Sequence, residues 1–281
     1  MYLNGITMNK VTVLAVVFLF SLLRAELWDS LAPGMELRWL KAIPITSIGD
    51  SGICVVRIDP AFWQMEFIGV SAANDTISRT ARQWAQGYGL AIAINAGMYA
   101  TDYKTHVGYT EIRGQVISRR INVYQSIAAF DPKDPRKARP FRIFDLDQPG
   151  VTVQSIRRDY ASLVQNLRLV KRPGENRWEK QEKEWSETAL GEDRKGRILF
   201  VFCRSPVSMY DFNRELLAAD IGLVALQHLE GGPQAQLFLK AGDFELEMSG
   251  KYTTFLNENK GNTTPPPIPN VLGMRRKAKG S

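Results

Sequence analysis

Short runs of β-branched and aromatic residues recur along this chain between turn residues, and this pattern limits the fold more than any other feature. The run LAIAINAG (90–97) is continuously apolar and stops at a glycine, which is typical of a buried central strand. Other runs predict hairpins about Gly114, about the charged turn 192–196, and about EGGP (230–233), which joins LVALQHL to QAQLFLK. The sequence therefore predicts one α+β domain with a mixed, largely antiparallel β-sheet core and a few short helices.

Three segments have the pattern of short helices. Residues 80–86 begin at a threonine and are followed closely by Gly89, a residue that commonly ends helices. Residues 156–165 repeat apolar positions at helical spacing. Ser208, with Asp211 three residues later, resembles the cap that begins a helix. We therefore expect a helix in each of these places.

The N-terminus has the features of a targeting segment. Its apolar stretch, 11–23, is flanked by basic residues and is shorter than the roughly 20 residues needed to span a bilayer. We expect residues 1–25 to be a signal peptide or short anchor, and the protein to be periplasmic or secreted, touching membrane only through this segment. The domain is expected over 34–256, followed by a proline-rich, basic, solvated tail over 257–281.

Composition and cysteine usage exclude several classes of protein. The net charge is +7, but no stripe of basic and aromatic residues indicates a nucleic-acid partner. Cys54 and Cys203 lie in apolar runs and are expected in the core, although an oxidising compartment would permit a disulfide between them. Two cysteines and two histidines offer no zinc-ligand spacing, so we expect no cofactor. The sequence does not decide whether a calcium or magnesium ion is bound by backbone carbonyls, because such a site would leave no sequence signature.

Two segments place a polar side chain beside small residues at a strand end. In NAGMY (95–99), Asn95 ends the buried strand and Gly97 lets a ligand or backbone approach closely, although an ordinary turn cap fits the same pattern. In LEGGP (229–233), the N–H groups of Gly231 and Gly232 could bind an anion, and Glu230 could act as a general acid or base. A simple turn with a solvated carboxylate is the alternative there.

Other polar side chains near these segments could share their pocket. His228 precedes Glu230 by two residues, so strand alternation places both on one face, although a buried structural histidine fits equally. Asp102 and His106 lie in a polar loop soon after NAGMY and could line the same pocket. These positions are candidates on proximity alone.

Two arginines are candidate anion ligands, because arginine binds phosphate and carboxylate in a bidentate manner. Arg204 leaves a buried strand, and Arg168 lies between apolar positions. Pairing with nearby acids would explain both arginines without any ligand. Asp211, at the start of the expected helix, is a candidate carboxylate in the same segment as Arg204.

The order of these segments resembles that of the phosphodiester glycosidase family. The matching stretches cover roughly residues 50–250 and are AINAGMY, QNLRLV, ETALGEDRKGRILFVFCR, DFNRELLAADIG and LQHLEGGPQAQLFL. The chain is most similar to a bacterial periplasmic branch that carries L-E-G-G-P. It differs from the family pattern at Glu187, where arginine is common, and at 233–235, where glycine and serines stand.

The resemblance implies an exported hydrolase that cleaves the glycosidic bond to a phosphodiester, with a carbohydrate or sugar-phosphate partner. It implies Glu230 as the catalytic carboxylate, Asn95 orienting the substrate, and Arg168 or Arg204 holding the phosphate. Asp102 and Asp211 are reserve candidates for a second carboxylate. The implied substrate-binding set comprises Gly97, Arg168, Arg204, Asp211, His228, Gly231 and Gly232. The departures leave open a non-catalytic envelope protein that binds glycan or polymer and keeps the fold.

Overall fold

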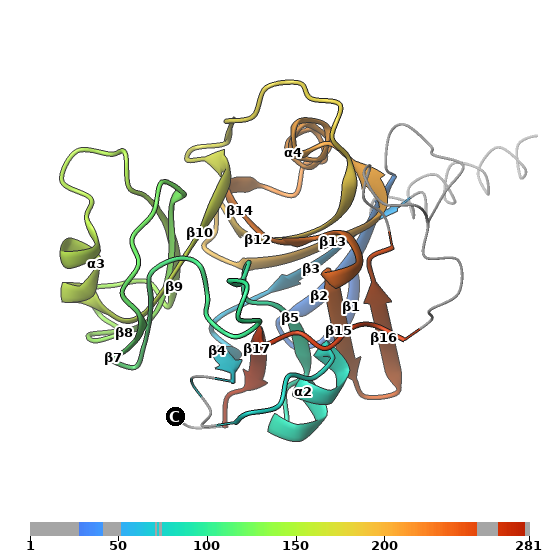
Figure 1. Cartoon of the computed structure of the whole chain (residues 1–281), viewed down its shortest axis with the longest axis horizontal. Helices are drawn as coiled ribbons and strands as arrows, with labels where there is room; N and C mark the ends of the chain where they lie inside the picture. The colour runs from blue at the N-terminus through green and yellow to red at the C-terminus, as the bar shows by residue number, and fades with distance from the viewer. Residues whose placement is uncertain (1–27, 42–51, 71, 73–74, 252–263, 279–281) are drawn as a thin grey trace, which may run out of the picture.

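The computed structural model describes residues 28–41, 52–70, 72, 75–251 and 264–278, and these form two antiparallel β-sheets (Figure 1). The larger sheet has the order β1-β2-β3-β13-β12-β14-β10-β6-β7, and β8, β9 and β11 pair outside this path. Its strands are β1 (Asp29–Ala32), β2 (Met35–Lys41), β3 (Gly52–Ile58), β6 (Thr110–Ile112), β7 (Gln115–Ser118), β8 (Gln125–Pro132), β9 (Phe141–Asp145), β10 (Tyr160–Lys171), β11 (Glu175–Asn176), β12 (Trp185–Asp193), β13 (Ile198–Val207) and β14 (Leu223–Gly231).

The smaller sheet packs against the larger one and has the order β16-β15-β5-β17-β4. The α-helices are short and lie outside the sheets. The α+β prediction, with one domain and largely antiparallel sheets, is confirmed. The remaining elements are β4 (Trp63–Gly69), β5 (Ile92–Asn95), β15 (Gln236–Ala241), β16 (Phe244–Ser249), β17 (Asn270–Arg276), α2 (Ala81–Tyr88), α3 (Val153–Asp159), α4 (Met209–Ala218) and a 3₁₀ turn, η1 (Gly232–Gln234).

Four apolar clusters hold the elements together, and one of them packs Ile156 of α3 on Ile127 and Leu163 of the larger sheet. The largest lies between the sheets, where Phe200 and Phe202 of β13 belong to one cluster with Ile94 of β5. A second core covers the outer face of the larger sheet beneath α4, and a third joins Trp84 of α2 to Phe238 of the smaller sheet. Figure 1 shows the resulting order: α4, larger sheet, smaller sheet, α2. Since burial of apolar surface drives folding, each sheet is stabilised from both faces.

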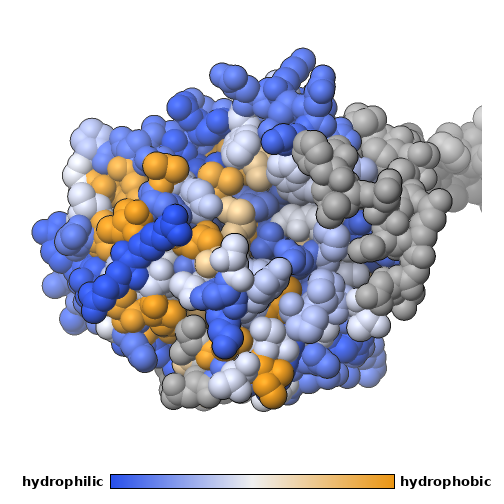
Figure 2. Space-filling view, in the orientation of Figure 1, coloured by the Kyte–Doolittle hydropathy of each residue, from blue (hydrophilic) through white to orange (hydrophobic). Residues whose placement is uncertain are grey.

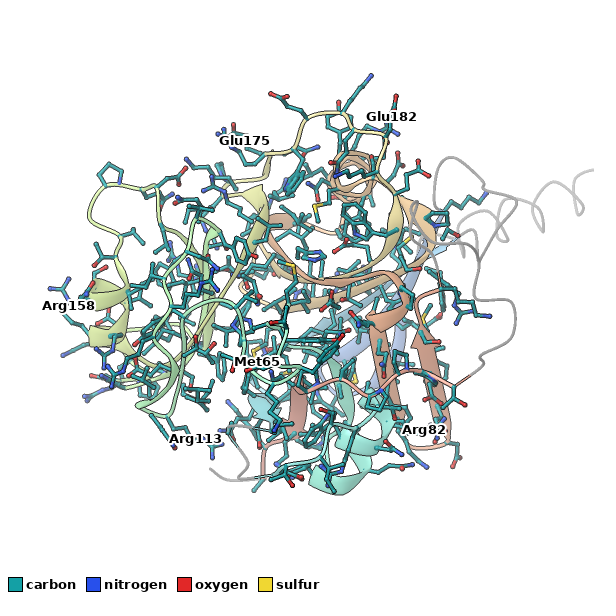
Figure 3. The ribbon with its side chains drawn as sticks, viewed as in Figure 1. Met65, Arg82, Arg113, Arg158, Glu175 and Glu182 are labelled. Carbon is teal, nitrogen blue, oxygen red and sulfur yellow. The ribbon has the colours of Figure 1, made fainter. Side chains whose placement is uncertain are left out.

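Polar and apolar residues are unevenly distributed over the molecular surface. Figure 2 shows hydrophilic residues over much of one face. Apolar residues gather on its left side, where β7, β8 and β9 lie in Figure 1. Charged side chains point outward at the edges, as do those of Arg158 on α3 and Glu182 before β12 (Figure 3). Fully buried side chains fill the space between the sheets.

Local sequence signals predict two of the helix boundaries well. Thr80 caps α2, with a reciprocal bond to Gln83, and Gly89 ends the helix in the left-handed conformation at φ 64°. The Ser208 hydroxyl accepts a hydrogen bond from the Asp211 N–H and begins α4. Both helices therefore start where the caps predict.

The expected helix over 156–165 is wrong. Helix α3 ends at Asp159, and the chain continues directly into the long strand β10. This strand is buried on both faces along most of its length, so its apolar residues do not alternate. A continuous apolar run cannot distinguish a buried strand from a buried helix.

Two further expectations about strand pairing are also wrong. The runs around EGGP do not form a hairpin, because β14 belongs to the larger sheet and β15 to the smaller one. The tail expected to be solvated from 257 instead contains β17, which pairs with both β4 and β5 and buries Val271, Leu272 and Met274. Its final basic residues are partly engaged, since Arg275 bonds Glu66 at 2.6 Å.

Cys54 and Cys203 do not form the disulfide that an oxidising compartment would permit. They lie on neighbouring strands, β3 and β13, but Cys54 belongs to the core between the sheets and Cys203 to the core beneath α4. The sheet separates the two thiols, and burial raises the pKa of Cys54 to about 12. Both residues are core residues, as their apolar surroundings predict.

The central place of β17 gives a first prediction. Leu272→Ala removes a fully buried side chain between β4 and β5 and is expected to lower the free energy of unfolding by about 2–5 kcal/mol. Arg276→Ala, at the exposed end of the same strand, is the control and should cost less than about 1 kcal/mol. Denaturant titration measures both values, and equal losses would contradict the central placement of β17.

Candidate functional site

The candidate site lies where the chain leaves the larger sheet at the end of β14. After Gly231 it passes through η1 and enters β15 of the smaller sheet. The Asn95 side chain, at the end of β5, donates to the Gln234 carbonyl at 2.9 Å and accepts from the Gln236 N–H at 2.7 Å. NAGMY and LEGGP, far apart in sequence, are therefore neighbours.

Thr188 of β12 fixes the backbone of Glu230. Its hydroxyl lies 3.0 Å from the Glu230 N–H and 2.8 Å from the Glu230 carbonyl oxygen. The same hydroxyl is 3.4 Å from the Asn95 amide oxygen. Three strands, β5, β12 and β14, thus meet at one hydroxyl group and set the position of the Glu230 carboxyl.

An open pocket of about 320 Å³ lies at this junction. Glu230 is the carboxylate that lines it, and its Oε1 accepts a hydrogen bond of 3.0 Å from the Gly231 N–H. Burial raises the pKa of Glu230 to about 6. Its carboxyl therefore titrates close to neutral pH, as acid–base catalysts commonly do. The pocket is lined by Trp185, His228, Glu230, Gly231, Gly232 and Pro233.

A second, fully buried carboxylate supports this pocket from behind. Glu187 accepts a hydrogen bond from the Trp185 indole N–H at 2.6 Å and contacts Nδ1 of His228 with its other oxygen. Burial alone would lower the pKa of His228, but the Glu187 charge, aided by Glu230, raises it above 6.5. The His228 imidazole therefore interacts with both carboxylates.

Sequence reasoning noted Glu187 only as a departure from the family pattern, and it gave Trp185 and Thr188 no role. These residues lie in the first half of β12, where Ser186, Glu187 and Thr188 are consecutive polar residues, and a single sequence presents β12 as one strand among many. Their importance comes from the pairing of β12 with β14, where an irregularity shifts the register between Thr188 and Ala189. No local signal predicts such a shift.

A buried polar cluster fixes the first half of NAGMY. The Asn166 amide donates to the Ala96 carbonyl at 3.0 Å, and its oxygen lies 3.2 Å from Nε2 of His106. Gly97 has φ 140°, and an added Cβ would lie 2.1 Å from the Asn166 oxygen. Burial lowers the pKa of His106, which suits a neutral ring that accepts the Gly108 N–H at Nδ1. Gly97 and His106 thus pack behind the strand end.

The remaining predicted residues lie elsewhere or make other contacts. Arg168 bonds Asp147 at 2.8 Å and Asp145 at 3.3 Å, and holds the pKa of Asp147 down to about 2. Arg204 donates from Nε to the Ser249 carbonyl at 3.2 Å. Neither is among the residues that line the Glu230 pocket.

The two reserve carboxylates are occupied in local structure. Asp211 receives the Ser208 hydroxyl at 2.7 Å and pairs with Arg214 at 2.9 Å in the first turn of α4. Asp102 is exposed and accepts the N–H groups of Lys104 and Thr105 at 2.9 Å. The structure therefore brings together Asn95, His228, Glu230 and the two glycines, and leaves the arginines and these aspartates outside the pocket.

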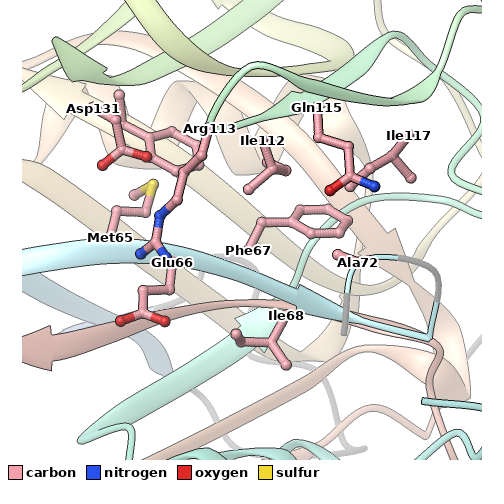
Figure 4. A pocket seen from close by; sticks show the side chains of 11 residues that line it. Met65, Glu66, Phe67, Ile68, Ala72, Ile112, Arg113, Gln115, Ile117 and Asp131 are labelled. Carbon is pink, nitrogen blue, oxygen red and sulfur yellow. The ribbon is translucent and has the colours of Figure 1, made fainter. Parts of the chain in front are cut away.

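A second pocket, of about 270 Å³, separates the outer edge of β4 from β6 and β7 (Figure 4). It contains none of the predicted site residues, and its carboxylates have partners: Glu66 pairs with Arg275, and Asp131 receives the Ser162 hydroxyl. Across the described part of the chain, no three His, Cys, Asp or Glu side chains are grouped as metal ligands.

No helix in the described ranges is long and apolar enough to cross a membrane. The N-terminal segment, residues 1–25, which we expect to be a signal peptide or anchor, lies outside the described residues.

The Glu187–His228 contact gives a second prediction. Glu187→Gln keeps a hydrogen-bond acceptor for Trp185 but removes the charge that raises the pKa of His228. The pKa of His228, followed by NMR of the imidazole ring, should therefore fall relative to the unmodified chain. His106, the chain's other histidine, is the internal control and should not change. An unaltered His228 titration would show that Glu187 does not set its charge.

The profile of the phosphodiester glycosidase family matches residues 88–275, which include β5, the pocket and all but the last residue of β17. The catalytic domain of zebrafish N-acetylglucosamine-1-phosphodiester alpha-N-acetylglucosaminidase, auto-inhibited by its pro-peptide, is similar in fold. Its TM-score is 0.60 at 14% identity, over 89% of this chain and 86% of that chain. A hypothetical protein from Synechocystis has a TM-score of 0.54 at 14% identity, over 86% of this chain and 62% of that one. No curated protein matches by sequence. The chain belongs to the phosphodiester glycosidase family.

Proposed function

We propose that this chain hydrolyses the glycosidic bond of a sugar-1-phosphodiester in the pocket around Glu230. One observation carries the proposal: a carboxyl whose pKa is raised to about 6 lines an open pocket beside a histidine that a buried carboxylate orients. Family membership supports the hydrolase class. The raised pKa values of Glu230 and His228, two neighbouring groups that line the pocket, provide the means for acid–base chemistry.

The reaction breaks the bond between the anomeric carbon and a phosphate oxygen. The phosphate monoester leaves with the bonding electron pair, and the anomeric carbon gains positive, oxocarbenium-like character. Water adds its oxygen to that carbon and loses one proton. In our proposal the ionised Glu230 stabilises the positive charge and accepts this proton. A phosphate leaving group needs little help from a general acid.

The phosphate requires a cationic partner, and His228 is the candidate in the pocket. Its Nδ1 is engaged by Glu187, so Nε2 is the nitrogen that could donate toward a substrate oxygen. Arg168 and Arg204, considered for this role from the sequence, are bonded to the acids and the carbonyl described above. We therefore assign phosphate binding to the imidazolium.

Asn95 has a positioning role in this proposal. Both polar atoms of its amide are bonded to the backbone on either side of Ala235, so the side chain fixes the turn that presents the pocket. Gly231 acts similarly, because its N–H orients the Glu230 carboxylate. In this proposal Glu230 and His228 are the side chains that contact the substrate.

We further propose that the protein acts in the periplasm or outside the cell. The support is the apolar stretch 11–23 with its basic flanks, which has the length of a signal-peptide core. We also propose that the partner is a sugar-phosphate substrate and not a nucleic acid. In this proposal the protein contacts a membrane only through residues 1–25.

Glu230→Gln tests the catalytic assignment. The amide keeps an oxygen acceptor for the Gly231 N–H but cannot ionise, so hydrolysis of a panel of sugar-1-phosphodiesters should fall by at least about a hundredfold in kcat. Glu247→Gln, on exposed β16, is the matched control and should retain full activity. Unaltered hydrolysis in Glu230→Gln would exclude Glu230, and tight binding without turnover by the unmodified chain would favour a glycan-binding protein.

The pKa of Glu230 predicts the pH dependence. Below about pH 6 the carboxyl is protonated and cannot accept a proton, so kcat/KM should rise as the pH increases through about 6. A rate that falls through the same range would mean that Glu230 acts as the acid form.

A further inference from the structure

The loop after NAGMY forms a tight hairpin between the two sheets. Tyr99 and His106 form an antiparallel bridge, and the Ala100 N–H donates to the Thr105 carbonyl at 2.8 Å. The Asn270 amide of β17 donates to the Lys104 carbonyl at 3.0 Å and anchors the tip. This hairpin lies within the long segment that follows β5 in Figure 1. It is therefore an ordered feature, tied to the smaller sheet.

The hairpin holds one large aromatic side chain in a costly position. Tyr103 has φ 56°, a left-handed conformation that a bulky residue rarely adopts, and its side chain is 65% exposed. The Asp102 carboxylate holds this turn, accepting two backbone N–H groups and, at 2.6 Å, the Thr105 hydroxyl. Neither core packing nor chain geometry accounts for an exposed tyrosine there.

The Tyr103 ring packs on Tyr99 of NAGMY, the segment that borders the Glu230 pocket. The two ring centroids are 5.9 Å apart and the planes are tilted by 47°. Tyr99 is half-buried, and burial together with the nearby Glu230 charge raises its pKa to about 12. Tyr99 also follows Asn95 by four residues, and the Asn95 amide holds the turn after Glu230, so the two rings continue from the strand end that borders the pocket. The indole of Trp185 lines the pocket itself.

We propose that Tyr99 and Tyr103 form a carbohydrate subsite, on which a sugar ring of the substrate stacks while its anomeric carbon faces Glu230. Sugar rings carry a face of C–H groups that packs on aromatic rings, and tyrosine adds a hydroxyl that can bond to the sugar. The inference rests on the proposed hydrolase function and assigns the substrate's carbohydrate part to this surface. Asp102 becomes a positioning residue for Tyr103.

Kinetics with a sugar-1-phosphodiester test the subsite. Tyr103→Ala should raise KM about two- to tenfold while kcat changes little, because the ring contributes binding rather than chemistry. Tyr103→Phe should lose much less. Val123→Ala, at another exposed apolar side chain, is the matched control and should leave both constants unchanged. An unchanged KM in Tyr103→Ala overturns the subsite.

Equilibrium binding separates the subsite from the catalytic proposal. In the Glu230→Gln background, calorimetric titration with N-acetylglucosamine 1-phosphate should show binding that Tyr103→Ala weakens by the same two- to tenfold. If the unmodified chain has no hydrolase activity but this loss is seen, the subsite stands and the hydrolase proposal fails. Hydrolysis without any effect of Tyr103 on binding overturns the subsite alone, and a chain that neither turns over nor binds such sugars overturns both.

The role of Asp102 has its own test. Asp102→Ala removes the acceptor that holds the turn and should reproduce the KM increase of Tyr103→Ala with kcat retained. Asp102→Asn keeps one acceptor oxygen for the two N–H groups and should restore KM. A large loss of kcat in both variants would instead give Asp102 a part in the chemistry and overturn the positioning role.

Discussion

The amide of Asn95 is the contact on which the site depends, because it holds the turn through which the chain passes from the larger sheet to the smaller one. It bonds the Gln234 carbonyl and the Gln236 N–H, and it belongs to β5, which lies between β15 and β17. The turn after Glu230 is thereby held against a buried, doubly paired strand. Loops positioned by a rigid scaffold can present reactive groups with little loss of order, and here one side chain supplies the connection.

The buried charges explain why the pocket sits where β12 and β14 pair. A buried carboxylate is costly unless it is paired and hydrogen-bonded, and Glu187 satisfies this need through Trp185 and His228. Glu230 has less compensation, since one backbone N–H and the nearby imidazole oppose its burial, and its pKa rises to about 6. The same arrangement therefore gives one carboxylate two hydrogen-bond partners and leaves the other able to gain a proton near neutral pH.

Local sequence patterns predicted the elements better than the contacts between them. The buried strand at 92–95, the Thr80 and Ser208 caps and the β12–β13 hairpin follow from residue spacing. The crossover at EGGP and the insertion of β17 do not, because they depend on which sheet a strand joins. The order of segments in the family predicted that Asn95 and Glu230 share a pocket. The contact of Glu187 with His228 could not be predicted in this way, because it depends on a register irregularity between β12 and β14. The Arg168 ion pair with Asp145 depends on the position of β9.

The glycines of LEGGP illustrate how one motif can have a structural explanation and still define a site. A Cβ on Gly231 would lie 2.6 Å from the Trp185 ring, and Gly232 adopts φ 64°. The Gly231 N–H donates to the Glu230 carboxylate. This N–H is therefore already bonded within the protein, unlike the free donor expected from the sequence for anion binding. The small residues thus allow an indole and a carboxylate to approach the same turn, and the reactivity of the site resides in the side chains that this close packing brings together.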